Sequence, residues 1–345
     1  MKFLVTGGLG SIGSALIKRL IAFPDYEVMN LDALTYAGRM SSLREENNHK
    51  RYSFIKGNVC DHVIVNELLN EYKPDVIMNL AAETHVDRSI KGSKVFLQTN
   101  IIGTHVLLEA AKAYWQMLSP RKKELFRFVH VSTDEVFGDI GETGCAADEL
   151  TRYAPNSPYS ASKASADFLV RAWSKTYGLP SIITNCSNNY GPRQYPEKLI
   201  PLMISNALLG RPLPVYGDGN QIRDWLYVDD HAEALILVSC KGRPGESYNI
   251  GGNNQYKNID VVHTLCTLLD NKVLRLPKNV KSHRELISFV EDRAGHDQRY
   301  AINCSKIKRE LGWVPTTNFE NGLEATVDWY LENPDWLSKD VDGDF

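Results

Sequence analysis

The chain has almost no net charge, no long apolar run and no closely spaced cysteines, and each absence excludes a class of protein. Its 39 basic and 42 acidic residues nearly cancel, which argues against binding nucleic acid or a membrane surface by neutralising phosphates. No apolar stretch approaches the roughly 18 residues of a membrane span, and the apolar run after Met1 is too short for a signal peptide. The six cysteines lack C-x-x-C spacing, so we expect reduced, mostly buried thiols, no bound metal and a cytoplasmic location.

The first residues have the pattern of a dinucleotide-binding strand–turn–helix unit. The apolar strand 3–5 runs into glycines at positions 7, 10 and 13 and then into an amphipathic helix. Gly7 and Gly10 let backbone amides approach a pyrophosphate, and Gly13 lets the helix pack close to the sheet. A second strand ends in Asp32, where a carboxylate bonds a ribose 2′-hydroxyl and repels a 2′-phosphate. The pattern predicts NAD rather than NADP, and the alternative is an ordinary turn between strand and helix.

Two adjacent acidic residues follow an apolar strand in the middle of the chain. The strand 126–131 leads into Ser132-Thr133-Asp134-Glu135, and the carboxyl end of a parallel strand faces the ligand crevice of a doubly wound sheet. The two carboxylates repel each other and burial disfavours their charged forms, so one can stay protonated while the other is ionised. Such a pair can remove a proton from one carbon and protonate a departing hydroxyl. A solvated acidic turn is the alternative interpretation.

A tyrosine and a lysine four residues apart begin the next long helix. The spacing of Tyr159 and Lys163 places both on one helix face, one turn apart. An ammonium beside a phenol favours the phenolate and so lowers a pKa that starts near ~10. The pair therefore predicts a base that accepts a hydroxyl proton while a hydride leaves for a nicotinamide. The motif alone is common in ordinary helices and gains meaning downstream of the glycine turn.

Between these motifs strands alternate with helices, which predicts a mostly parallel, doubly wound α/β sheet. We expect strands at 52–55 and 76–80 and helices at about 63–72 and 95–115. His85 follows the strand 76–80, and it is either a ligand or a structural histidine. From about residue 188 loops rich in Pro and Gly predict a second, smaller unit, with a helix from Val228 that Asp229 or Asp230 caps.

The glycine turn, Asp32 and Tyr159-x-x-x-Lys163 together resemble the extended short-chain dehydrogenase/reductase superfamily. Within it, nearly the whole chain resembles the dTDP-glucose 4,6-dehydratase family. The acidic pair Asp134-Glu135 matters most, because sugar-nucleotide epimerases of the superfamily lack it. Other matching stretches are 31–38, 83–89, 132–138, 185–192, 196–201, 221–228, 248–252, 292–297 and 311–313. The chain departs from the family's usual residues at Leu9, Ser11, Asn58 and Ala294.

The resemblance implies a Rossmann-like NAD-binding domain over residues 1–187, with a segment at about 226–256 crossing back to it. Residues 188–345 would mainly bind a sugar nucleotide. The implied reaction converts dTDP-glucose into dTDP-4-keto-6-deoxyglucose and water with tightly held NAD. UDP-glucose or another nucleotide sugar is the alternative substrate, and a sugar-nucleotide epimerase is the alternative enzyme. A non-catalytic NAD-sensing or scaffold protein is a further alternative, against which the presence of both Tyr159 and Lys163 argues.

The family also implies a homodimer through a four-helix bundle. Each protomer would contribute the helix at about 95–115 and the helix that begins at Tyr159. Apolar residues such as Leu107, Leu108, Trp115 and Trp173 support such a contact only indirectly.

The resemblance further implies roles for individual residues. Asp134 is the expected general acid, Glu135 the general base and Tyr159 the base of the oxidation step, while Lys163 tunes Tyr159 and Thr133 bonds the sugar. Expected NAD contacts are Gly7, Gly10, Ser11, Ile12, Gly13, Asp32, Ala33, Leu34, Thr35, Asn58, Val59, Leu80, Ala81, Ala82, Thr84, Thr99, Tyr159, Lys163 and Asn189. Expected sugar-nucleotide contacts are Thr84, Thr133, Asn188, Lys198, Leu199, Pro214, Val215, Tyr216, Arg223, Asn258, Asp292, Arg293 and His296. Without the family, Lys198, Arg223 and Arg293 are expected at the surface.

Overall fold

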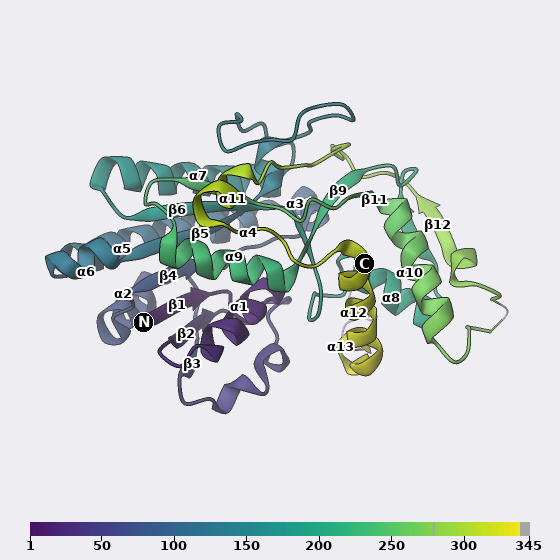
Figure 1. Ribbon diagram of the computed structural model, residues 1–345, viewed down its shortest axis with the longest axis horizontal. Helices are drawn as coiled ribbons and strands as arrows, with labels where there is room; N and C mark the ends of the chain where they lie inside the picture. Colours follow the sequence, from purple (N-terminus) through teal and green to yellow (C-terminus); the bar gives the residue numbers. More distant parts are fainter. Residues whose placement is uncertain (279, 339–345) are drawn as a thin grey trace.

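The computed structural model describes residues 1–278 and 280–338 and contains a central parallel sheet of seven strands (Figure 1). Its strand order is β10-β6-β5-β4-β1-β2-β3, and every neighbouring pair is parallel. The strands are β1 (Lys2–Thr6), β2 (Glu27–Asp32), β3 (Tyr52–Lys56), β4 (Val76–Asn79), β5 (Arg127–Thr133), β6 (Ser181–Cys186) and β10 (Ser247–Ile250). The order reverses between β1 and β4, and ligands bind beyond the carboxyl ends of the strands at such a point.

Helices cover both faces of the sheet, because side chains alternate between the two faces along each strand. Phe3 and Val5 pack into one core with α1 (Ser11–Ala22) and α9 (Val228–Lys241). Leu4 points into the opposite core with α2 (His62–Tyr72), α5 (Thr104–Met117) and α7 (Pro158–Tyr177). The short helices α3 (Val86–Lys91) and α6 (Pro120–Leu125) lie in the loops of this half, and α4 (Lys94–Phe96) is the first turn of the long helix that ends in α5. This confirms the predicted Rossmann-like sheet.

A second, smaller core lies at the other end of the molecule, on the right in Figure 1. It is built on a three-stranded sheet of β7 (Asn188–Tyr190), β9 (Ile222–Tyr227) and β11 (Gln255–Lys257) and a two-stranded sheet of β8 (Leu213–Tyr216) and β12 (Ile287–Val290). Its helices are α8 (Leu199–Leu208), α10 (Asn258–Lys272), α12 (Phe319–Glu332) and α13 (Pro334–Ser338). The chain crosses between the two cores more than once, because α9, β10 and α11 (Ser305–Leu311) all pack with the large sheet.

The predicted helix at 95–115 is helical but interrupted. Between α4 and α5 the stretch Leu97–Gly103 winds as a π-helix, a form that often accompanies a functional position. Asn100 in this stretch bonds the backbone of Glu83 on both sides, accepting from its N–H (2.9 Å) and donating to its C=O (3.0 Å). The irregular winding thus ties this helix to the loop that follows β4.

Three smaller expectations have mixed outcomes. Neither aspartate caps α9: its N-cap residue Tyr227 makes no side-chain cap bond, and buried Asp230 instead accepts from Thr316 Oγ1 (2.6 Å) and Thr317 N (2.9 Å). The six cysteines are free thiols as expected, but Cys145 and Cys240 are exposed rather than buried. Among the described helices none has the length and apolar character to cross a membrane.

Candidate active site

A cavity of about 300 Å³ opens at the carboxyl ends of the central strands. Loops after β1, β2, β3 and β4 line one part of it, and the ends of β5 and β6 with the first turns of α7 line another. Its lining includes both the glycine turn and the acidic pair. The sheet topology therefore brings the three motifs of the sequence to one place.

The glycine turn is shaped for a group that approaches the backbone closely. Gly7 has φ +70°, and a Cβ there would lie 2.8 Å from backbone atoms of Ala81. Gly13 packs against the turn itself, since a Cβ there would lie 2.3 Å from the Gly7 carbonyl oxygen. The N-cap residue Gly10 makes no side-chain cap bond, so the first N–H groups of α1 stay available for an anion. These residues fit the pyrophosphate of a dinucleotide.

Asp32 ends β2 at the rim of the same cavity. Its carboxylate accepts hydrogen bonds from the backbone N–H of Leu9 (2.9 Å) and of Leu34 (2.8 Å). Burial raises its pKa while these two bonds oppose the rise. The bonds hold the carboxylate in one orientation beside the glycine turn, as a ribose-binding group requires.

The acidic pair lies at the end of β5, where the two carboxyl groups have different surroundings. Asp134 is 3 % exposed, and its Oδ2 has no partner among the described residues. Burial, followed by the charges of Glu135 and Asp224, raises the pKa of Asp134 well above its usual value. Burial also raises the pKa of Glu135, but Arg223, Lys198 and Arg293 all oppose that rise. Of the two carboxyl groups, Asp134 therefore holds its proton more strongly than Glu135.

Tyr159 and Lys163 face the cavity from the first two turns of α7. Tyr159 is buried, and its phenol interacts with the Thr133 hydroxyl. Burial and then the charge of Glu135 raise the pKa of Tyr159 well above its usual value, so the expected lowering by Lys163 is wrong for these surroundings. The reason is that Lys163 Nζ points to the carbonyl of Val131 (2.7 Å) rather than to the phenol.

The expectation that Lys198, Arg223 and Arg293 lie at the surface is also wrong. Arg223 is 6 % exposed and donates to the carbonyl of Asp297 (2.9 Å), and Lys198 Nζ donates to the carbonyl of Thr84 (2.9 Å). Arg293 is partly buried and donates two hydrogen bonds to the carboxylate of Asp87, from Nε (2.5 Å) and from Nη2 (2.9 Å). All three place positive charge near Glu135, which suits an anionic ligand.

His85 caps a helix and is not among the residues that line the cavity. It is the N-cap residue of α3, where its Nδ1 accepts from the backbone N–H of Arg88 (3.3 Å). Burial lowers its pKa to about 4, so it is neutral at pH 7.

The structure gathers the expected cofactor residues around the cavity with one exception. Leu34 does not line it; its backbone N–H instead bonds Asp32. Of the expected sugar-nucleotide residues, Thr84, Thr133, Asn188 and Lys198 line the cavity. The others lie outside its lining, in or beside the second core: Leu199, Pro214, Val215, Tyr216, Arg223, Asn258, Asp292, Arg293 and His296. Val215 in particular is buried in that core.

Several residues that line the cavity were not expected from the sequence. Glu83 and Glu197 are two of them, each adjacent in sequence to an expected residue. Glu197 accepts from Tyr36 OH (3.0 Å) and lies 3.5 Å from His85 Nε2. Others are Cys186, Ser187, Gln194 and Tyr195. Glu83, Cys186, Ser187 and Glu197 lie within the stretches 83–89, 185–192 and 196–201 that match the family, and this was the sequence signal for them. Gln194 and Tyr195 lie between two such stretches.

Comparison with known proteins decides the family. A family model described as GDP-mannose 4,6 dehydratase matches residues 4–326. The dTDP-glucose 4,6-dehydratase of Escherichia coli is 54% identical and aligns over 100% of this chain and 98% of its own length. That of Haemophilus influenzae is 56% identical, over 96% and 98% of the two chains. The chain belongs to the dTDP-glucose 4,6-dehydratase family.

Solved structures of the dTDP-glucose 4,6-dehydratase family have the same architecture. The Streptomyces venezuelae enzyme, crystallised with NAD and a second ligand, superposes with a TM-score of 0.88 at 43% identity, over 97% and 98% of the chains. The Bacillus anthracis enzyme in complex with NAD gives 0.85 at 46%, with the same coverage. A UDP-glucose 4-epimerase of Thermotoga maritima shares the architecture (TM-score 0.83, 97% and 100% covered) but only 27% of the sequence. The fold alone therefore does not separate dehydratases from epimerases.

Proposed function

We propose that this protein converts dTDP-glucose into dTDP-4-keto-6-deoxyglucose and water, as an NAD-dependent lyase. The observation that carries the proposal is the acidic pair at the end of β5, next to Tyr159 and Lys163. Asp134 is buried beside two other carboxylates, those of Glu135 and Asp224, and favours its protonated form, whereas three cations oppose the rise in the pKa of Glu135. A dehydration needs both an acid and a base at neighbouring carbons, and this pair supplies them.

The cavity is suited to NAD along its length. Gly7, Gly10 and Gly13 would hold the pyrophosphate, and Asp32 the adenosine ribose. Lys163 and Tyr159 would lie near the nicotinamide end, beside the acidic pair. NAD, when bound, supplies a positively charged ring that accepts a hydride from sugar C4 and returns it to C6.

Each proton transfer of the proposed reaction has its own side chain at or beside the acidic pair. Tyr159, assisted by Thr133 and Lys163, takes the proton of the C4 hydroxyl as C4 is oxidised to a ketone. The ketone acidifies the C5 proton, which Glu135 removes while Asp134 protonates the C6 hydroxyl that leaves as water. After reduction at C6, C5 takes a proton that originates in solvent. Arg223, Arg293 and Lys198 would neutralise the diphosphate of the substrate.

An isotope experiment tests this sequence of steps. A substrate deuterated at C4 is expected to give product deuterated at C6 of the same molecule, with a solvent proton at C5, because the stored hydride returns within the site. Mass spectrometry and NMR of the product measure both positions. Stoichiometric release of reduced cofactor, or the absence of deuterium at C6, would contradict the proposal and favour an ordinary dehydrogenase.

The nucleotide base is tested separately. We expect dTDP-glucose to be the preferred substrate, because the full-length relatives at 54–56% identity carry that name. Comparing kcat/KM for dTDP-glucose and UDP-glucose, with product identified by NMR, decides it. A higher value for UDP-glucose would reassign the substrate while leaving the dehydratase chemistry in place.

Asp32 is expected to make the site selective for NAD. Its carboxylate is held at the cavity rim by two backbone bonds, so it would repel a 2′-phosphate. Asp32→Ala should therefore narrow the gap between the dissociation constants of NAD and NADP, measured by calorimetry. Equal binding of both cofactors by the unaltered protein would show this interpretation of Asp32 to be wrong.

We further propose a homodimer in which α5 and α7 of each protomer form a four-helix bundle. Helices α5 and α7 contact each other at one side of the sheet (Figure 1), and Phe168 on α7 is 55 % exposed, with Ile102 in the preceding π-helical turn also exposed. Leu107 and Leu108, which the sequence suggested for this contact, are buried in the core and cannot contribute. Burying the exposed apolar side chains in a symmetric contact favours a dimer.

Light scattering at micromolar concentration should give twice the chain mass for the unaltered protein, and Phe168→Glu should lower the measured mass. A monomer mass for the unaltered protein would exclude this dimer.

A further inference from the structure

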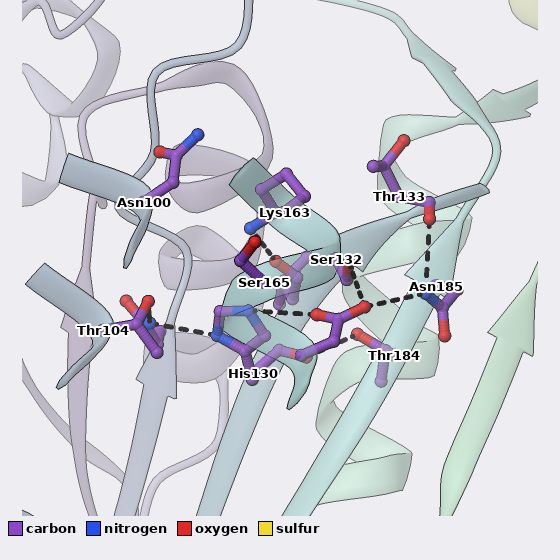
Figure 2. Close-up of polar contacts among 12 residues, drawn as sticks. Asn100, Thr104, His130, Ser132, Thr133, Lys163, Ser165, Thr184 and Asn185 are labelled. Carbon is purple, nitrogen blue, oxygen red and sulfur yellow. Dashed lines mark hydrogen bonds and ion pairs between the residues drawn. The ribbon is translucent and has the colours of Figure 1, made fainter. Parts of the chain in front are cut away.

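A buried polar cluster lies between β5 and α7, behind the site, and the chemistry proposed above does not use its central residue. That residue is Asp167, whose side chain is fully buried. Its Oδ2 accepts hydrogen bonds from Ser132 Oγ (2.8 Å) and Tyr153 OH (2.9 Å), with Asn185 Nδ2 at 3.5 Å. Its Oδ1 lies 3.3 Å from His130 Nε2, although neither atom has an aligned hydrogen bond. Figure 2 shows His130, Ser132 and Asn185 turned toward one shared carboxylate.

The hydrogen-bond pattern makes His130 neutral. Thr6 Oγ1 accepts from the Ala81 N–H (3.1 Å), so its own proton is free to donate to Asn79 Oδ1 (2.9 Å). Asn79 therefore presents an N–H to His130 Nδ1 (3.1 Å), which leaves the ring proton on Nε2, facing Asp167. Burial and the charge of Lys163 also lower the pKa of His130. The negative charge of Asp167 is consequently not cancelled by a histidinium.

Helix α7 holds three consecutive residues of β5 through this cluster. Lys163 and Asp167 are four residues apart and share one helix face. Lys163 Nζ donates to the carbonyl of Val131 (2.7 Å), and Asp167 contacts the residues on either side of Val131, namely His130 and Ser132. The strand then continues directly into the acidic pair.

Strand β6 extends the cluster to the site itself. Asn185 Nδ2, beside Asp167, also donates to the carbonyl of Thr133 (3.2 Å). The two elements that carry the proposed acid, base and tyrosine are therefore joined by one set of buried contacts. Lys163 is itself 4 % exposed, and a buried ammonium without a nearby negative charge is costly.

We infer that Asp167 is a positioning residue, which fixes the position of α7 relative to the end of β5. It also supplies the buried negative charge that keeps Lys163 cationic. The inference rests on the proposed function, because Lys163 and Tyr159 carry its first step. The Coulomb interaction with Asp167 raises the pKa of Lys163 against the lowering effect of burial. Asp167 does not itself line the cavity, and it reaches the site through Ser132, which does line it, and through Lys163.

A urea unfolding cycle tests the charge pairing without any substrate. Asp167→Asn and Lys163→Met each leave one buried charge alone, so each should lower the urea midpoint of unfolding. The double variant removes both charges, and its midpoint should lie above the value expected from adding the two single losses. If Asp167→Asn alone fails to fold, the double variant should regain a cooperative transition. Simple additivity, or failure of both to fold, would overturn the inference.

The pH dependence of turnover is a second readout, because a purely structural role of Asp167 would leave it unchanged. Removing the negative charge at position 167 makes Lys163 lose its proton at lower pH, so the alkaline limb of the kcat profile for Asp167→Asn should move down by about one pH unit. The other charged or titratable groups near Asp167 are His130 on β5, Tyr153 in the preceding loop and Arg171 on α7, which donates to Tyr153 OH (3.2 Å). Cys186 on β6 and His130 also act on Lys163 or are acted on by its charge.

The matched control is Asp230→Asn. Asp230 is also a buried aspartate with two bonds, but it holds the 316–317 segment to α9 and does not line the cavity. The alkaline limb of the kcat profile of Asp230→Asn should match that of the unaltered protein. An equal shift in Asp167→Asn and Asp230→Asn would mean that Asp167 only stabilises the fold. If the unaltered protein forms no 4-keto-6-deoxy product, the proposed function fails, while the urea cycle still decides whether Asp167 and Lys163 are coupled.

Discussion

Glu135→Gln is expected to oxidise the sugar and reduce the bound cofactor, and then to stall before water is lost. Glutamine keeps the shape of the side chain but cannot accept the C5 proton. Overall turnover should therefore fall by about 10²–10⁴, the usual contribution of a general base. Tyr159, Thr133 and Lys163 remain in place, so the first step should persist. Absorbance of the reduced cofactor at enzyme concentration, compared with product formation, measures the two steps separately.

The surroundings of Glu135 explain why this variant separates the steps. Arg223, Lys198 and Arg293 favour the charged form of Glu135, and the charge of Glu135 helps to keep Asp134 protonated. Loss of the Glu135 charge therefore removes the base and also lowers the pKa of Asp134, so that Asp134 is protonated less often. Glu67→Gln, on the exposed face of α2, is the control and should turn over normally. Full turnover by Glu135→Gln would mean that another group removes the C5 proton.

Tyr159→Phe is expected to block the reaction one step earlier, with no reduced cofactor formed. The phenol is the group at the cavity that can take the C4 hydroxyl proton, and it is removed without changing the size of the ring. Turnover should again fall by about 10²–10⁴. The buried ring keeps its edge contact with Phe96 (6.4 Å between centroids), so the fold should survive. Single-turnover absorbance distinguishes this variant from Glu135→Gln.

A matched tyrosine outside the site controls for the loss of a hydroxyl. Tyr26, whose OH lies 3.7 Å from Cys240 Sγ, does not line the cavity, and Tyr26→Phe should show normal cofactor reduction. Cofactor reduction by Tyr159→Phe at the unaltered rate would assign the oxidation step to a different base. If neither variant reduces the cofactor while both keep an unchanged circular dichroism spectrum, the loss comes from a defect that both share, such as loss of bound cofactor. The Tyr159 phenol would then not be the cause.

Local patterns in the sequence were sufficient for the sheet and the catalytic motifs. The strand 3–5 followed by the glycine turn and the Tyr159–Lys163 spacing each depend on contacts within a few residues or one helix turn, and Asp32 is recognisable as the last residue of a short apolar strand. Such contacts are encoded by period and spacing, which is why the predicted strands and helices agree with β1 to β5, α1 and α2.

Side-chain environment could not be inferred in the same way. Arg223 is a typical surface residue by type, and only the packing of β9 beside the 297–300 segment buries it. The aspartates expected to cap α9 have other partners, because the distant segment 316–317 offers Asp230 a hydroxyl and an N–H. The pKa of Tyr159 rises rather than falls, since burial outweighs a lysine that points elsewhere.

The sequence by itself determined the order of strands and helices along the chain and the glycine turn, and its resemblance to the family supplied the proposed acid, base and tyrosine. Only the tertiary structure decided their protonation. Asp134 and Glu135 are neighbours in the chain, yet cations from β9, the start of α8 and the 292–297 loop lie near Glu135 and oppose the rise of its pKa. The physical reason is that charge and desolvation act through space over several ångströms, so groups far apart in sequence set the pKa of each carboxyl.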